Sequence, residues 1–141
     1  MVACAALIGH LFEQKMQEVE KLLQKDQFAS FNGIELLTVS EGSAVTRMKI
    51  LPQHLNGMGI VQGGAIFTLA DFAFAAASNS HDKSAVGLTT SITYIKAESS
   101  GVLYARASEL SLRRTIAVYQ VDIVNENEEL VAVFQGTVYR K

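Results

Sequence analysis

The sequence has very little cysteine and little charge, and each shortage excludes a class of protein. Cys4 is the only cysteine, so no internal disulfide can form, and a thiol this near the terminus suits neither a buried nucleophile nor a metal cluster. Charged residues make up only 18% of the chain and the formal net charge is -2, which leaves no basic footprint for nucleic acid or an anionic membrane. We therefore expect neither partner, and a reducing, cytoplasmic location.

No linker, repeat or low-complexity tract interrupts the chain, which predicts a single domain over residues 1–141. No apolar run without a charge reaches the roughly 18 to 20 residues that cross a bilayer. The apolar start, Met1 to Gly9, lacks the basic residues of a signal peptide and is interpreted as the lead-in to a helix. Hydrophobic residues make up 49% of the chain, which together with the low charge favours a surface partly covered by other subunits.

Hydrophobic periodicity predicts two helices and six strands. Apolar residues recur at three- and four-residue spacing from His10 to Lys25, as in an amphipathic outer helix. Residues 63–80 are apolar almost all round and rich in alanine, which indicates a buried helix. Alternating segments bounded by turn residues predict strands over residues 33–40, 44–51, 86–94, 103–107, 117–123 and 130–138. This pattern predicts an α+β fold, with an antiparallel sheet of about six strands around the apolar helix.

Asp71 is the only Asp, Glu, Lys or Arg between Lys49 and Asp82, and it lies in the middle of the apolar helix. An ionised carboxylate there costs several kcal/mol unless it is paired, hydrogen-bonded or open to a water-filled cleft. Carboxylates of this kind are candidates for functional sites. The alternative is a helix edge that reaches solvent or a structural pair with a distant arginine, and the residue alone does not separate these interpretations.

Gln62, Gly63 and Gly64 come directly before this helix. The free amides of a first helical turn, with the partial positive charge there, suit an oxyanion or a polarised carbonyl. Glycine also lets a substrate approach the backbone closely. Adjacent glycines are common at ordinary strand-to-helix turns, which is the alternative interpretation.

The whole motif resembles a known family. Asn56-Gly57-x4-Gln62-Gly63-Gly64-x4-Leu69-Ala70-Asp71-x-Ala73-x2-Ala76, followed by Asn79-Ser80, is similar to the motif of hot-dog-fold acyl-CoA thioesterases of the phenylacetate-degradation (PaaI-like) type. The likeness extends from about Gly33 to Arg140. It implies a hot-dog fold, in which the sheet wraps around the central helix, and hydrolysis of acyl-CoA thioesters without a cofactor.

The resemblance also implies roles for particular residues. Asp71 corresponds to the catalytic carboxylate, the Gly63 amide to the oxyanion donor, and Asn56 to a side chain that orients the thioester or the attacking water. A hydroxyl on the strand after the helix assists in this family, and both Thr89 and Thr90 lie in that region.

Gln62 departs from the family pattern, which usually has histidine at this position. Glutamine keeps a hydrogen-bond donor and an acceptor but cannot change its charge near neutral pH. Any role that needs imidazolium is therefore lost, whereas the backbone amide of Gly63 is unaffected.

Helix geometry separates Gly63 from Asp71. Eight residues at roughly 1.5 Å per residue place them about 12 Å apart along one helix, too far to serve one carbonyl. If both act on one thioester, Asp71 must come from a second chain whose helix runs antiparallel, which gives a twofold dimer with two composite sites. The resemblance agrees, since hot-dog thioesterases have sites at a dimer interface and this type often pairs dimers into a homotetramer.

In the expected reaction, the Gly63 amide polarises the thioester carbonyl and Asp71 acts as general base or as nucleophile. Further contacts with the substrate are expected from Gly64, and contacts with CoA phosphates from Arg113, Arg114 and Lys96. A solvated loop is the alternative for the arginine pair.

Other kinds of site are less well supported by the sequence. The three histidines, His10, His54 and His81, lack ligand spacing, so no metal site is expected. A hot-dog hydratase or dehydratase is expected to pair its carboxylate with a histidine, which Gln62 disfavours. A non-catalytic acyl-CoA sensor is disfavoured by the presence of Asp71.

Overall fold

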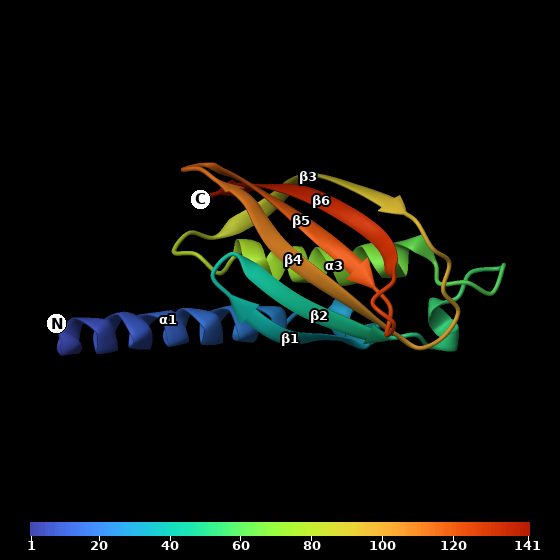
Figure 1. Cartoon of the computed structure of the whole chain (residues 1–141), viewed down its shortest axis with the longest axis horizontal. Coiled ribbons are helices and arrows are strands. Elements are labelled where there is room, and N and C mark those ends of the chain that lie inside the picture. The colour runs from blue at the N-terminus through green and yellow to red at the C-terminus, as the bar shows by residue number, and fades with distance from the viewer.

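One antiparallel sheet of six strands curves around a single helix in the computed structural model, which describes all 141 residues (Figure 1). The helical elements are α1 (Val2–Leu23), α2 (Gln27–Phe31), the 3-10 turn η1 (Pro52–His54) and α3 (Gly63–Ser78). The strands are β1 (Ile34–Ser40), β2 (Ser43–Lys49), β3 (Ala85–Tyr94), β4 (Val102–Leu112), β5 (Ile116–Val124) and β6 (Leu130–Arg140). The α+β architecture predicted from the sequence is confirmed.

The element boundaries differ from the prediction at the N-terminus. The first helix begins at Val2 rather than His10, because the alanine-rich start favours helix and nothing stops it there. Helix α2 was not predicted, since five residues are too few to show a helical period; it begins where the Asp26 side chain accepts a hydrogen bond from Ala29 N at 2.9 Å. From Met16 onward α1 packs on the body, whereas its first turns extend away from it (Figure 1).

The sheet order β1-β2-β4-β5-β6-β3 leaves β3 at one edge. Its only strand partner is β6, and most of its residues are exposed. Val86 and Leu88 are among the exposed large hydrophobic side chains. An edge strand with free backbone groups and exposed apolar side chains is a surface on which another strand can pair.

No helix of the structure combines the length and the apolar character needed to cross a membrane.

Helix α3 lies inside the curve of the sheet (Figure 1). Leu69, Ala70 and Ala73 are completely buried, and the small alanines allow the helix to approach the strands closely. Phe74 fills the space between the helix and the sheet, with its ring centroid 5.8 Å from that of Tyr119 and 5.4 Å from that of Phe134. These contacts hold α3 in one position, with a single face left uncovered.

Gly136 of β6 lies directly against the Phe74 ring. A Cβ atom at Gly136 would lie 2.6 Å from Cζ of Phe74, and the ring is held on its other sides by Tyr119 and Phe134. We therefore expect Gly136→Ala to lower the free energy of unfolding by about 1–3 kcal/mol, measured by urea denaturation.

The matched control is Gly57→Ala, because a Cβ atom at Gly57 meets nothing within 4 Å. We expect this substitution to change the unfolding free energy by less than about 0.5 kcal/mol. Equal urea midpoints for the two variants would show that the Phe74 ring moves aside without cost.

Candidate active site

The turn at the start of α3 leaves one backbone amide free. Gln62 is the N-cap of the helix, and its Oε1 accepts a hydrogen bond from Gly64 N. Gly63 N donates no hydrogen bond within the chain, since no helical carbonyl precedes it and no side chain caps it. The free amide belongs to Gly63, while the Gly64 amide and the Gln62 oxygen are engaged with each other. In this chain Gln62 therefore organises the turn.

Tyr94, at the end of β3, covers the same turn, although the sequence analysis did not identify it as a site residue. Its hydroxyl donates to Gly63 O at 2.9 Å, and a Cβ atom at Gly63 would lie only 2.8 Å from that hydroxyl. A side chain at position 63 would therefore displace the Tyr94 ring and break its hydrogen bond to Gly63 O. A tyrosine phenol is already protonated at neutral pH, and partial burial raises the pKa of Tyr94 further above its ordinary value of 10.0. No sequence signal marks Tyr94, because its alternating strand pattern indicates only a strand.

Asn56 lies in the loop that leads to this turn. Its Oδ1 accepts hydrogen bonds from Met58 N at 2.9 Å and from Ile60 N at 3.4 Å, while its amide NH2 has no partner in the chain. The loop is supported by His54, which is buried and whose Nδ1 accepts from Leu51 N at 3.0 Å. Asn56 therefore keeps a free donor close to the Gly63 turn, and His54 has a structural role.

Asp71 lies on the uncovered face of α3, together with Gly64 and Thr68, which precede it by two turns and one turn of the helix. It makes no ion pair and no side-chain hydrogen bond, so the alternative of a structural pair with a distant arginine is excluded. Although the residue is exposed, loss of hydration raises the pKa of Asp71, and the nearby Asp26 carboxylate raises it further. A free carboxylate with a raised pKa suits proton transfer.

The strand register distinguishes the two threonines on β3. Thr90 pairs with Gly136, whose missing side chain faces Phe74, so Thr90 lies on the helix side of the sheet. Thr89 pairs with Thr137 and, by the alternation of a strand, lies on the outer side. A bulge between Gly87 and Thr89 determines which of the two threonines faces the helix, and the sequence pattern does not show the bulge.

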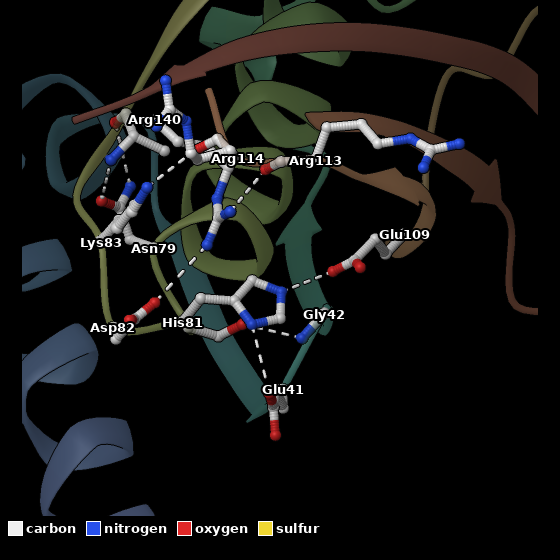
Figure 2. A network of polar contacts seen from close by, with 12 residues as sticks. Glu41, Gly42, Asn79, His81, Asp82, Lys83, Glu109, Arg113, Arg114 and Arg140 are labelled. Atoms are coloured by element: carbon white, nitrogen blue, oxygen red, sulfur yellow. Dashed lines mark hydrogen bonds and ion pairs between the residues drawn. The ribbon is translucent and has the colours of Figure 1, made fainter. Parts of the chain in front are cut away.

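The basic residues considered for phosphate binding lie at two different ends of α3. Lys96 follows the strand whose Tyr94 touches Gly63, and its Nζ is paired with Glu98 Oε1 at 2.8 Å. The arginine pair lies beyond the C-terminal end of α3 (Figure 2), where Arg114 O accepts a hydrogen bond from Lys83 Nζ at 2.9 Å. Within one chain, therefore, Lys96 is near the glycine turn and the arginine pair is not.

A polar network that the sequence did not indicate lies next to the arginine pair (Figure 2). His81 is buried between two carboxylates, with Nε2 2.5 Å from Glu109 Oε2 and Nδ1 3.3 Å from Glu41 Oε1. The Tyr119 hydroxyl also donates to Glu109, at 3.2 Å. These contacts join the β1–β2 turn and the residues after α3 to the sheet, at the opposite end of α3 from Gly63.

Comparison with known proteins relates this chain to thioesterases and esterases. The family model of the thioesterase superfamily matches residues 58–132. A putative esterase of Archaeoglobus fulgidus is 39% identical over 90% of this chain and 86% of its own length. The acyl-coenzyme A thioesterase PaaI of Escherichia coli is 34% identical over 88% of this chain and 89% of its own.

Solved structures give the same result. The E. coli PaaI structure superposes with a TM-score of 0.85 at 32% identity, covering 94% of each chain. A hypothetical thioesterase of Streptococcus pneumoniae, solved with coenzyme A, has a TM-score of 0.80 at 29% identity and covers 86% of this chain and 95% of its own. The resemblance inferred from the motif is confirmed. With a central helix that carries Asp71 and begins at a free Gly63 amide, inside a hot-dog sheet, this chain belongs to the thioesterase superfamily.

Proposed function

We propose that this protein hydrolyses acyl-CoA thioesters to the free acid and CoA. The observation that carries the proposal is the pair of unpartnered groups on α3: the free Gly63 amide at its N-terminus and the free Asp71 carboxylate on its uncovered face. The activity named for the E. coli relative and the coenzyme A bound to the S. pneumoniae protein support the same substrate class.

In the proposed mechanism, the thioester oxygen accepts a hydrogen bond from Gly63 N–H, where the helix N-terminus stabilises the developing negative charge. The free NH2 group of Asn56 donates to the thioester or holds the attacking water. Asp71 takes a proton from that water, whose oxygen bonds to the carbonyl carbon. The carbon–sulfur bond then breaks and the CoA thiolate takes up a proton. In the alternative route, Asp71 attacks the carbonyl carbon itself, the carbon–sulfur bond breaks and the CoA thiolate leaves and is protonated. Water then cleaves the resulting anhydride, which releases the acid and restores Asp71.

The proposed active unit is a twofold dimer in which each site takes Gly63 from one chain and Asp71 from the other. Two features support it: the distance along α3 that separates these residues, and the free, apolar edge of β3. Antiparallel α3 helices also bring the arginine pair, Arg113 and Arg114, of one chain toward the glycine turn of the other, where they can bind CoA phosphates. Pairing of such dimers into a tetramer is part of the proposal.

A thiol-release assay with acetyl-, hexanoyl-, phenylacetyl- and palmitoyl-CoA tests the function directly. We expect release of CoA from at least one of these substrates at a rate that depends on the enzyme concentration. Binding of every acyl-CoA without release of thiol from any would replace the thioesterase by an acyl-CoA sensor.

The pH profile tests the role of Asp71 as a base. Because burial and the Asp26 charge raise the pKa of Asp71, the active carboxylate is lost, as the pH falls, at a higher pH than for an ordinary aspartate. We therefore expect the acidic limb of kcat/KM to lie above 3.8, the ordinary pKa of an aspartate side chain.

Asp26→Asn gives a matched check on that interpretation. Asparagine keeps the N-cap of α2 but removes the negative charge that helps to raise the pKa of Asp71, so the acidic limb should move to lower pH. A limb that stays in place, or moves to higher pH, would assign the titration to another group.

A further inference from the structure

A cavity of about 450 Å³ opens beside the glycine turn, between α2 and the first turns of α3. Its α3 side includes Gln62, Gly64 and Thr68, so both chain neighbours of Gly63, the residue whose amide is free, line the cavity. Phe28 of α2 forms the opposite wall. Gly64 and Thr68 belong to the uncovered face of α3, so the cavity opens on that face, beside the glycine turn.

The only titratable side chain in the lining of this cavity is His54, and both of its ring nitrogens are hydrogen-bonded, to Leu51 N and Asn32 O. No aspartate, glutamate, lysine or arginine contributes to it, and two phenylalanines, Phe28 and Phe67, provide apolar surface. Phe67 is held in place by an edge-on contact with Phe134, at a centroid distance of 5.4 Å. Leu55 and Ala65 add to the apolar surface, and the remaining side chains of the lining are polar: Asn32, Gln53, His54, Gln62 and Thr68. Apolar surface combined with polar groups is typical of a small-molecule site.

A second cavity, of about 550 Å³, lies between α1, α2 and β1. It differs from the first in the charge of its lining and in its position relative to the glycine turn. Three carboxylates, those of Glu20, Asp26 and Glu35, line it, and no residue of the glycine turn does. Carboxylates repel the phosphates of CoA and are costly to cover with an apolar group. The uncharged cavity is therefore the better fit for a group attached to the thioester.

We propose that the cavity between α2 and α3 is the acyl subsite and that Phe28 is a specificity-determining residue, selecting bulky uncharged acyl groups over acetyl. This inference rests on the proposed thioesterase function, because it is the Gly63 amide that fixes the carbonyl at the mouth of the cavity. A hexanoyl or phenylacetyl group has more apolar surface to bury against the Phe28 ring than an acetyl group has. An acyl group that ends in a carboxylate finds no cation in the cavity and is disfavoured.

The neighbouring Phe31 provides a matched control. Both rings belong to α2 and are largely exposed, Phe28 at 64% and Phe31 at 82%, so neither substitution by alanine removes a core side chain. Phe31 does not line the cavity. The experiment measures kcat/KM of the natural chain, Phe28→Ala and Phe31→Ala with acetyl-, hexanoyl-, phenylacetyl- and glutaryl-CoA.

Phe28→Ala is expected to lower the hexanoyl-to-acetyl and phenylacetyl-to-acetyl ratios of kcat/KM about tenfold, chiefly through KM, since it removes apolar contact that substrate and transition state share. Phe31→Ala should leave both ratios within about twofold of those of the natural chain. For the natural chain, glutaryl-CoA should have a lower kcat/KM than hexanoyl-CoA, whose acyl group has a similar length but no charge. Equal losses for all substrates in Phe28→Ala, or the same ratio change in Phe31→Ala, would overturn the assignment.

Binding measurements separate this inference from the function on which it rests. If the natural chain releases no thiol, the hydrolase proposal fails, and calorimetric titration with uncleaved hexanoyl-CoA still tests the subsite. A Kd about tenfold weaker for Phe28→Ala than for Phe31→Ala supports the acyl subsite, and equal Kd values for the two variants remove it.

Discussion

Replacing Asp71 by asparagine is expected to lower kcat about a thousandfold, with little change in the affinity for acyl-CoA. Asparagine has nearly the same shape but can neither accept the proton of the attacking water nor form an anhydride. Because the Asp71 carboxylate makes no ion pair or hydrogen bond in the chain, the variant should fold normally. Thiol release under saturating substrate measures kcat, and thermal unfolding checks the fold.

Asp26→Asn is the control for this variant, since it replaces a nearby aspartate while preserving its N-cap hydrogen bond. At neutral pH it should retain most of the activity. An Asp71→Asn enzyme with undiminished kcat would remove Asp71 from the chemistry, and a loss equal to that of Asp26→Asn would indicate a general effect of charge.

Mixing two inactive variants is expected to restore activity if the sites are shared. Gly63→Val places side-chain atoms where Tyr94 lies, since even a Cβ atom would be 2.8 Å from its hydroxyl, and so disturbs the glycine turn. In a mixed dimer of Gly63→Val and Asp71→Asn chains, one site receives the natural Gly63 and the natural Asp71. Random exchange of subunits should therefore restore about a quarter of the natural number of sites.

The control is each variant taken alone through the same exchange procedure, which should remain inactive. Sedimentation or light scattering of the mixture establishes that mixed dimers have formed. Mixed dimers without activity would mean that Gly63 and Asp71 do not meet across the interface, and the composite site would then be wrong.

Most of the secondary structure was predictable because helix and strand leave periodic patterns among near neighbours. The buried face of α3 and the β1–β2 hairpin around Glu41 and Gly42 follow from such patterns. Helix α2 did not, since it spans little more than one turn. Its position matters for the site, because Phe28 of this helix lines the cavity beside the glycine turn. The carboxylate of its N-cap residue, Asp26, also raises the pKa of Asp71.

The sequence by itself determined that one carboxylate, Asp71, interrupts an apolar helix and that glycines precede that helix, and a motif of this length was sufficient to identify the family. Only the tertiary structure decided that Gly63, rather than Gly64, has the free amide, because the direction of the Gln62 side chain decides which amide is capped. Only the tertiary structure, likewise, shows that the Tyr94 hydroxyl donates a hydrogen bond to Gly63 O, 31 residues earlier in the chain. Local patterns report on residues within a turn or a strand pair, whereas such contacts depend on how the whole chain packs.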